Sequence, residues 1–222
     1  MLERILPPSA CVVATEKDLE GVLYPEEEDA VAQAVEKRRR EFTTARVCAR
    51  EALTRLGYPE RAIPSGPRGE PVWPAGVVGS ITHCDGYRAC AVAREEDLLS
   101  IGVDAEPDEP LPGGLLEDIA LPEERERLHQ LSREAPGVHW DRLLFSIKES
   151  VYKAWFPLAE RWLGFEDAMV SIDRREGSFS ARLLVPGPSL NDSELRGFDG
   201  RWLAAEGLVM AAIALPASGE AP

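Results

Sequence analysis

Apolar residues between positions 25 and 56 recur three or four residues apart, which is the spacing of one face of an α-helix. Pro25 suits the first turn of such a helix, and Gly57 is a natural stop. The stripe predicted to be buried contains one charged residue, Arg38. Its guanidinium either extends along the helix to water or meets an anion at this face. Whether residues 42–45 interrupt the helix stays open.

Apolar and polar residues alternate in the region that follows, as they do in half-buried β-strands. Strands are predicted at residues 77–83, 88–94 and 100–106. The dipeptide Asp85-Gly86 between the first two is a strong hairpin signal. Upstream of these strands, the density of Gly and Pro at residues 63–71 predicts a loop.

The second part of the chain repeats this order of helix and then strands. A long amphipathic helix is predicted from Val138, and Pro157 should end or kink it near Lys153 because proline removes one helical hydrogen bond. Further elements are predicted as a helix at residues 121–132 and as strands at residues 168–173, 178–185 and 201–215, the last divided by a turn at Glu206-Gly207. The pattern therefore predicts an α+β fold of two similar halves, residues 1–106 and 107–222.

The composition shows that the protein is acidic. The 222 residues carry 25 Lys and Arg against 39 Asp and Glu, a formal net charge of −14 at pH 7. That balance argues against generic binding to a nucleic-acid backbone, which needs a broad cationic face. Basic residues gather locally between Lys37 and Arg55, where they form either a solvated helix face or a site for an anionic ligand.

Two further features concern the cellular setting. No apolar run approaches the roughly 20 residues of a membrane-spanning helix, and the first residues lack the basic and apolar regions of a signal peptide. Four cysteines show no Cys-x-x-Cys pairing, which is typical of reduced thiols in a core. We therefore expect a cytoplasmic, globular monomer that binds neither nucleic acid nor membranes.

A pair of carboxylates marks the strand predicted at residues 100–106. Asp104 and Glu106 are two residues apart, so their side chains lie on the same face of the strand. Carboxylate oxygens of this kind suit Mg²⁺, which proteins hold through one or two carboxylates plus substrate phosphates. The alternative is a solvated sheet face that carries two acids.

Glu149 and Lys153 are four residues apart and share one face of the long helix. They form either an ordinary ion pair, which contributes only about 0.2–0.5 kcal/mol, or a base or metal ligand beside a cation that meets developing phosphate charge. His83, at the end of a predicted strand, either binds a phosphate or caps a turn. No other histidine or paired cysteine lies at zinc-ligand spacing, so a zinc site is not expected.

In this order the motifs of the chain resemble one family, the 4′-phosphopantetheinyl transferases of the surfactin and enterobactin type, and most closely its actinobacterial members. The resemblance spans nearly the whole chain. The matching segments are FTTARVCAREAL at residues 42–53, GEP at 69–71, GSITH at 79–83, IGVDAE at 101–106, KESVYKAWFP at 148–157 and RWLGFED at 161–167. The combination of the IGVDAE and KESVYK segments at this separation is highly specific.

The resemblance implies a fold and a reaction. Members of the family are pseudo-twofold pairs of α/β halves with the active site in the cleft between them. They transfer the 4′-phosphopantetheine arm of coenzyme A to a serine hydroxyl of an apo acyl or peptidyl carrier protein and release adenosine 3′,5′-bisphosphate. The partners implied are carriers of polyketide, nonribosomal peptide or fatty-acid synthases. The cofactor implied is Mg²⁺, with Mn²⁺ as the alternative.

Roles for residues follow from the same resemblance. Asp104, Glu106 and Glu149 would hold the metal ion on the pyrophosphate. Glu149 would also accept the serine proton, and Lys153 would stabilise the leaving phosphate. The residues implied to contact coenzyme A are Arg38, Arg46, Gly66, Arg68, Gly69, Glu70, Pro71, Thr82, His83, Lys148 and Lys153. Relatives often carry a lysine where this chain has Ser65, so either Arg68 replaces that phosphate contact or the contact is absent.

Two rival functions stay open on the sequence. One is a metal-dependent hydrolase that splits the coenzyme A pyrophosphate with water, and the other is a coenzyme A-binding protein without catalysis. The presence of Glu149 together with Lys153 disfavours the second rival, because binding alone does not need a base.

Overall fold

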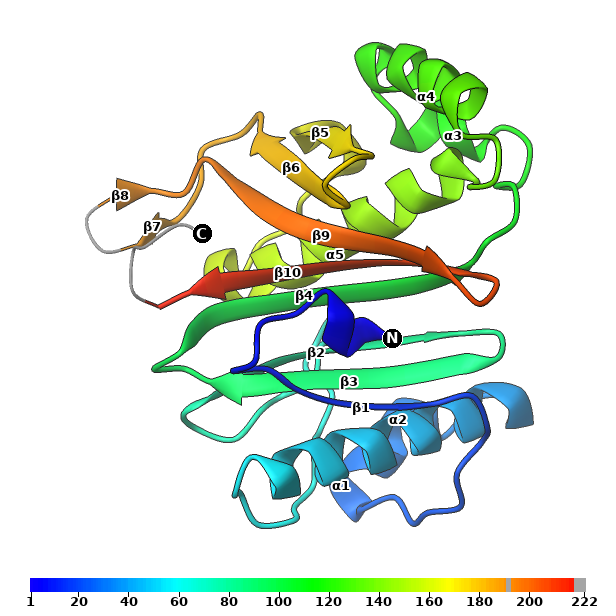
Figure 1. The fold of residues 1–222 in the computed structure, drawn as a ribbon. Coiled ribbons are helices and arrows are strands. Elements are labelled where there is room, and N and C mark those ends of the chain that lie inside the picture. Colours follow the sequence, from blue (N-terminus) through cyan, green and yellow to red (C-terminus); the bar gives the residue numbers. More distant parts are fainter. Residues whose placement is uncertain (191–192, 218–222) are drawn as a thin grey trace.

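The computed structural model describes residues 1–190 and 193–217, which form two main sheets that lie side by side (Figure 1). The helices are η1 (Leu2–Arg4), α1 (Pro25–Glu28), η2 (Asp29–Val31), α2 (Glu36–Arg55), α3 (Leu115–Ile119), α4 (Pro122–Glu134), α5 (Trp140–Ala159) and η3 (Phe165–Asp167). The strands are β1 (Cys11–Thr15), β2 (Val77–Cys84), β3 (Tyr87–Arg94), β4 (Leu98–Pro107), β5 (Ala168–Asp173), β6 (Ser178–Leu183), β7 (Ser189–Leu190), β8 (Ser193–Glu194), β9 (Gly197–Ala205) and β10 (Leu208–Pro216).

Each main sheet carries one long helix. The first sheet has three strands in the order β1-β3-β2, and α2 packs against it. The second has five strands in the order β4-β10-β9-β6-β5, and α5 packs against β4 and β10 (Figure 1). This arrangement confirms the predicted α+β class and most of the predicted strands. The strand β1, which pairs with β3, was not predicted.

The strand β4 joins the two halves. It is the last strand of the predicted N-terminal half, residues 1–106, yet it hydrogen-bonds along one edge to β10 in the C-terminal half. Its other edge lies along β2. Only residues 95–97 link β4 to β3. The pairing therefore places the change of sheet before β4, whereas the division of the chain after residue 106 stays a prediction.

Side-chain hydroxyls connect β2 to β4 where a backbone ladder would run in a continuous sheet. The N–H of Val103 donates to Ser80 Oγ at 3.1 Å, and the N–H of Ala105 donates to Thr82 Oγ1 at 3.0 Å. All four residues are buried, so both N–H groups would lose their partners without these hydroxyls. We call Ser80, Thr82 and the two N–H groups the hydroxyl seam.

A glycine sets the distance between β4 and α5. A Cβ built on Gly102 would lie 1.9 Å from the backbone oxygen of Ser150, so a larger residue cannot fit unless the helix moves. Ser100 Oγ donates to the backbone oxygen of Ala154 at 2.7 Å on the same helix. The close approach brings the polar face of α5 against the strand that carries Asp104.

The helices differ from prediction at two points. The first predicted helix is broken before Glu36, not at residues 42–45, and Val35 there is extended and 74% exposed. The long helix does not end near Lys153, because α5 runs to Ala159, and the alternative of a kink there stays a prediction. Pro157 lies in the last turn, where the loss of one hydrogen bond is outweighed by the buried side chains that continue along the helix to Trp155.

The N-terminal segment covers the junction of the two sheets on the side opposite α5 (Figure 1). Leu2 and Ile5 form one apolar cluster with residues of β3, β4 and β10, among them Ala91, Val103 and Met210. This cluster buries the junction from one side and α5 buries it from the other. Within residues 1–190 and 193–217, no helix combines the length and the hydropathy needed to cross a bilayer.

We expect Gly102→Ala to lower the free energy of unfolding by about 1–3 kcal/mol, because the added methyl group overpacks the contact with α5. Urea denaturation monitored by circular dichroism would measure the change. Gly113→Ala is the matched control, since no atom lies within 4 Å of a Cβ at that position. Equal stability of the two variants would contradict the close packing of β4 on α5.

Candidate active site

A cavity of about 670 Å³ lies between the two halves and is lined by residues from both of them. The N-terminal half contributes α2, β2 and the loop at residues 67–71, and the C-terminal half contributes α5. The predicted site residues that line it are Arg38, Arg46, Arg68, Gly69, Glu70, Pro71, His83, Glu149 and Lys153. The cavity thus brings together residues that are more than 100 positions apart in the chain.

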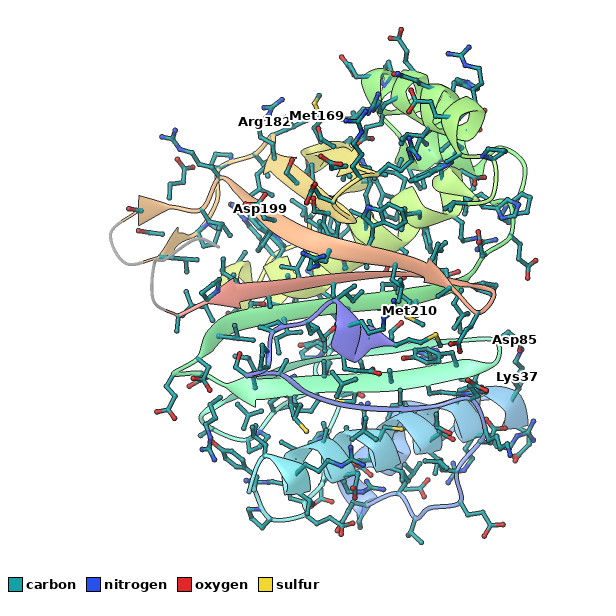
Figure 2. All side chains as sticks on the ribbon, viewed as in Figure 1. Lys37, Asp85, Met169, Arg182, Asp199 and Met210 are labelled. Atoms are coloured by element: carbon teal, nitrogen blue, oxygen red, sulfur yellow. The ribbon has the colours of Figure 1, made fainter. Side chains whose placement is uncertain are left out.

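Most basic residues of the strip between Lys37 and Arg55 are already paired with acids. Lys37 forms an ion pair with Asp85, visible near the end of α2 in Figure 2. The other pairs in this strip are Arg39 with Glu28, Arg40 with Asp18 and Glu36, Arg50 with Glu27 and Glu60, and Arg55 with Glu51. These carboxylates offset the positive charge of the strip, which makes it less suited to dock an acidic partner.

Arg38 and Arg46 are the exceptions in this strip, and Arg68 lines the same cavity. Across the part of the chain that the structure describes, Arg38, Arg46 and Arg68 have no carboxylate within ion-pair distance. A guanidinium without a counter-charge in a cavity is suited to bind an anionic ligand such as a phosphate. This explains why Arg38 could occupy an otherwise apolar position in the sequence pattern.

Arg46 is the most buried of the three, with 4% of its surface exposed. Its Nη2 donates to Ser65 Oγ at 2.9 Å, and its guanidinium lies 4.1 Å from the centre of the Phe42 ring. Its Nε has no hydrogen-bond partner in the described residues. Burial lowers the pKa of Arg46 to about 10, so the group stays charged at neutral pH. A buried guanidinium with one N–H donor still available is suited to bind an anion.

His83 lies beside Arg38, whose Nη1 is in contact with the Nε2 atom of the imidazole. Burial, and then the positive charges of Arg38 and Lys153, lower the pKa of His83 to about 4. The imidazole is therefore neutral at physiological pH and accepts a hydrogen bond from the guanidinium. An anion bound here would favour the protonated form of His83.

The loop that borders the cavity holds its own shape. Gly66 N–H donates to the backbone oxygen of Glu70 at 2.7 Å, and Arg68 N–H donates to Glu70 Oε2 at 2.9 Å. The Glu70 carboxylate packs over Gly66, where a Cβ would meet it at 2.0 Å. Arg68 extends from this loop to the Phe156 ring, 5.8 Å away on α5. The carboxylate of Glu70 thus bonds within its own loop, whereas the side chain of Arg68 reaches across the cavity to α5 in the C-terminal half.

Asp104 lies at the junction of the two halves and is 4% exposed. Its Oδ1 accepts a hydrogen bond from Lys153 Nζ at 2.7 Å and one from Thr82 Oγ1 at 3.2 Å. Its Oδ2 is buried and has no hydrogen-bond partner within the described ranges. Native structures rarely leave a buried carboxylate oxygen unpartnered, so Oδ2 is an open ligand position.

Two further carboxylates face the same region. Glu106 accepts a hydrogen bond from Arg142 Nη1 at 3.0 Å. Burial and the charge of Asp104 nevertheless raise the pKa of Glu106 to about 7. Burial also raises the pKa of Glu149, although Lys153 opposes the shift. Sequence reasoning missed Arg142, because no local spacing connects it to a strand more than 30 residues earlier.

The donor set fits a divalent cation. Among the residues that the structure describes, no three His, Cys, Asp or Glu side chains are close enough to enclose a metal ion by themselves. The fit rests on the buried Asp104 Oδ2, which accepts no hydrogen bond from the described residues, and on the charge of Asp104, which acts on both Glu106 and Glu149. Oxygen donors of this kind suit Mg²⁺.

Three of the residues predicted to contact coenzyme A do not line the cavity, namely Gly66, Thr82 and Lys148. Lys148 is buried on the far side of α5, where its Nζ forms an ion pair with Glu124 at 2.8 Å and donates to the backbone oxygen of Phe165. Lys148 does not line the cavity but lines a smaller hollow that adjoins it, so its contact with coenzyme A stays a prediction. Thr82 is buried in the hydroxyl seam, and Gly66 lies beneath Glu70.

A second hollow of about 100 Å³ adjoins the cavity, and Glu149 and Tyr152 line both. Its remaining lining is largely apolar and includes Trp162, Leu163 and Phe165. Trp162 is 63% exposed and lies 4.9 Å from the Tyr152 ring, centre to centre. Through Glu149 and Tyr152 the two hollows connect the arginines of the cavity with the exposed side chain of Trp162.

Comparisons with known proteins agree with this geometry. Residues 26–93 match the 4′-phosphopantetheinyl transferase N-terminal domain, and residues 100–205 match the 4′-phosphopantetheinyl transferase superfamily. The chain is 56% identical to the 4′-phosphopantetheinyl transferase Svp of Streptomyces mobaraensis, over 89% of this chain and 80% of that protein. It is 51% identical to Npt of Nocardia iowensis, over 96% and 99% of the two chains. Identity to PptT of Mycobacterium tuberculosis is 48%, over 86% and 85%.

We expect Arg38→Gln to raise the pKa of His83 above about 4 while leaving it below 6.5, because the neighbouring charge is lost and the burial remains. The imidazole signals in an NMR titration would measure this. Lys37→Gln is the control, since Lys37 pairs with Asp85 and Glu41 and does not contact His83. The same pKa in both variants would contradict the assigned contact.

Proposed function

The chain belongs to the 4′-phosphopantetheinyl transferase superfamily and transfers the 4′-phosphopantetheine arm of coenzyme A to carrier proteins, and on that premise we propose how its residues carry out the reaction. The observation that carries the proposal is the cavity between the halves. It is lined by three arginines without carboxylate partners and by Glu149 and Lys153 of α5.

Coenzyme A binds in this cavity with its phosphates toward α2. Arg46 supplies a buried charge with a free Nε donor, and Arg38 and His83 supply a second donor group next to it. The loop at residues 66–71 borders the adenine, and its internal hydrogen bonds fix the backbone that the base meets. Arg68 takes the place of the lysine that relatives often carry at the position of Ser65, because its guanidinium extends over the cavity.

Asp104, Glu106 and Glu149 are the residues that would hold a divalent cation, Mg²⁺ or Mn²⁺, with Asp104 Oδ2 as its buried ligand. When bound, such an ion neutralises negative charge on the pyrophosphate. Lys153 contributes a cation from the protein itself. Its Nζ donates to Asp104 Oδ1 and lies at the cavity wall, where it can also donate to a phosphate oxygen.

Glu149 is the general base of the transfer. Burial raises the pKa of its carboxylate, which strengthens it as a proton acceptor near neutral pH. Glu149 takes the proton of the carrier serine, and the serine oxygen bonds to the phosphorus that bears the pantetheine arm. The bond from that phosphorus to the bridging oxygen breaks, and adenosine 3′,5′-bisphosphate leaves with the oxygen. Lys153 stabilises the charge that develops on the leaving phosphate.

The pantetheine arm and the carrier approach from the C-terminal half. The apolar hollow beside Glu149 can hold the arm against Tyr152 and Phe165. Trp162 offers exposed apolar surface next to the same glutamate. The carrier partners are apo acyl or peptidyl carrier proteins of polyketide, peptide or fatty-acid synthases. One more distant relative, 36% identical over 53% of the chain, is named enterobactin synthase component D of Escherichia coli.

We expect Glu149→Gln to slow the transfer by about 10²-fold or more, because the base is removed while the shape is kept. Intact-protein mass spectrometry of an apo carrier protein with coenzyme A and Mg²⁺ would follow the gain of the arm. Coenzyme A should still bind to the variant, as measured by calorimetry. Glu134→Gln, at the end of α4, is the control for loss of a glutamate away from the cavity.

Two outcomes would contradict this mechanism. Full activity of a folded Glu149→Gln variant would remove Glu149 from the base role. Release of adenosine 3′,5′-bisphosphate by the wild type in the absence of any carrier would show that the enzyme splits coenzyme A with water instead.

A further inference from the structure

The hydroxyl seam contains two residues that make the same backbone contact. Ser80 and Thr82 both accept a hydrogen bond from a β4 N–H, at 3.1 and 3.0 Å. Both are buried, and they lie two residues apart on β2. A hydroxyl that accepts from an N–H still has its own hydrogen to donate. The two residues differ in what they do with that hydrogen.

Thr82 donates to a carboxylate of the proposed cation site, and Ser80 does not. Thr82 Oγ1 donates to Asp104 Oδ1 at 3.2 Å. In the described residues Ser80 Oγ has no equivalent acceptor. Because Ala105 N–H occupies a lone pair of Thr82 Oγ1, that contact orients the hydroxyl so that its hydrogen can reach Asp104.

Asp104 is therefore held at one oxygen from two elements. Thr82 donates to Oδ1 from β2 in the N-terminal half, and Lys153 donates to Oδ1 from α5 in the C-terminal half. The other oxygen, Oδ2, receives no hydrogen bond within residues 1–190 and 193–217. Two donors on one oxygen fix the plane of the carboxylate and leave the second oxygen available.

We propose that Thr82 is a positioning residue whose hydroxyl, supplied by the N-terminal half, locks Asp104 so that Oδ2 is presented to the divalent cation. This inference rests on the proposed function, since it assigns a role toward the cation of that site. Without the hydroxyl, Lys153 is the one donor to Oδ1 that remains among the described residues, and the carboxylate can rotate. A ligand that must be reoriented before it binds a metal binds it more weakly.

The test is a titration of the enzyme–coenzyme A complex with Mn²⁺, followed by electron paramagnetic resonance. We expect Thr82→Val to raise the Mn²⁺ dissociation constant by about tenfold or more, as is typical when an outer-shell partner of a metal ligand is lost. Thr82→Ser keeps the hydroxyl and should bind Mn²⁺ within about threefold of the wild type. In steady-state assays KM for Mn²⁺ should rise in Thr82→Val while KM for coenzyme A stays unchanged.

Ser80→Ala separates positioning from stability. It removes the matching hydroxyl of the seam and leaves Val103 N–H without its partner, so it should lower the unfolding temperature about as much as Thr82→Val does. It removes no hydrogen bond to Asp104, so its Mn²⁺ affinity should match the wild type. Thr82→Ala is a second hydroxyl-free variant in case Thr82→Val does not fold.

The outcomes distinguish the two levels of the proposal. If folded Thr82→Val or Thr82→Ala binds Mn²⁺ as tightly as the wild type, the positioning role is wrong while the cation site stands. Equal weakening by Ser80→Ala would also overturn it, because the effect would then follow from the loss of the seam. If the wild type itself does not bind Mn²⁺ in the presence of coenzyme A, the cation site of the proposed function is wrong.

Discussion

The contact between β4 and α5 is the constraint on which the rest of the site depends. Gly102 lets the helix backbone approach the strand, and the approach brings Lys153 Nζ to 2.7 Å from Asp104. The same contact turns Glu149 toward the cavity while Lys148, its neighbour in sequence, is buried against Glu124 on the other side of the helix. One strand and one helix thus supply Asp104, Glu149 and Lys153, to which the proposed mechanism assigns its roles.

The distribution of ion pairs along α2 leaves unpaired charge at the cavity of this acidic protein. Exposed basic residues of α2 such as Lys37 are already paired with carboxylates, and exposed pairs contribute little to stability. Their effect is to remove competing cationic surface. The guanidinium groups of Arg38, Arg46 and Arg68 keep their charge free inside the cavity, so a net charge of −14 is compatible with a substrate that carries several phosphates.

The sequence predicted what depends on local patterns. The alternation of apolar and polar residues predicted β2, β3 and β5 nearly to the residue. Glu206-Gly207 predicted the turn between β9 and β10, and both residues have the positive φ that such a turn needs. The association of Asp104 with Glu149 came from family resemblance, since neither spacing alone distinguishes a site from a solvated face. Contacts such as Arg142 with Glu106 join segments far apart in the chain, so no local signal could reveal them. The ion pair of Lys148 with Glu124 was not predicted for the same reason.

The short link between β3 and β4 has a mechanical consequence. Residues 95–97 tie the two sheets together, and Asp97 is itself held by hydrogen bonds to Arg94 and Ala217. Separation of the two halves as rigid bodies would break the buried hydrogen bonds of the seam along β2. The contact of Arg68 with the Phe156 ring also joins the two halves, but it can change without breaking those hydrogen bonds.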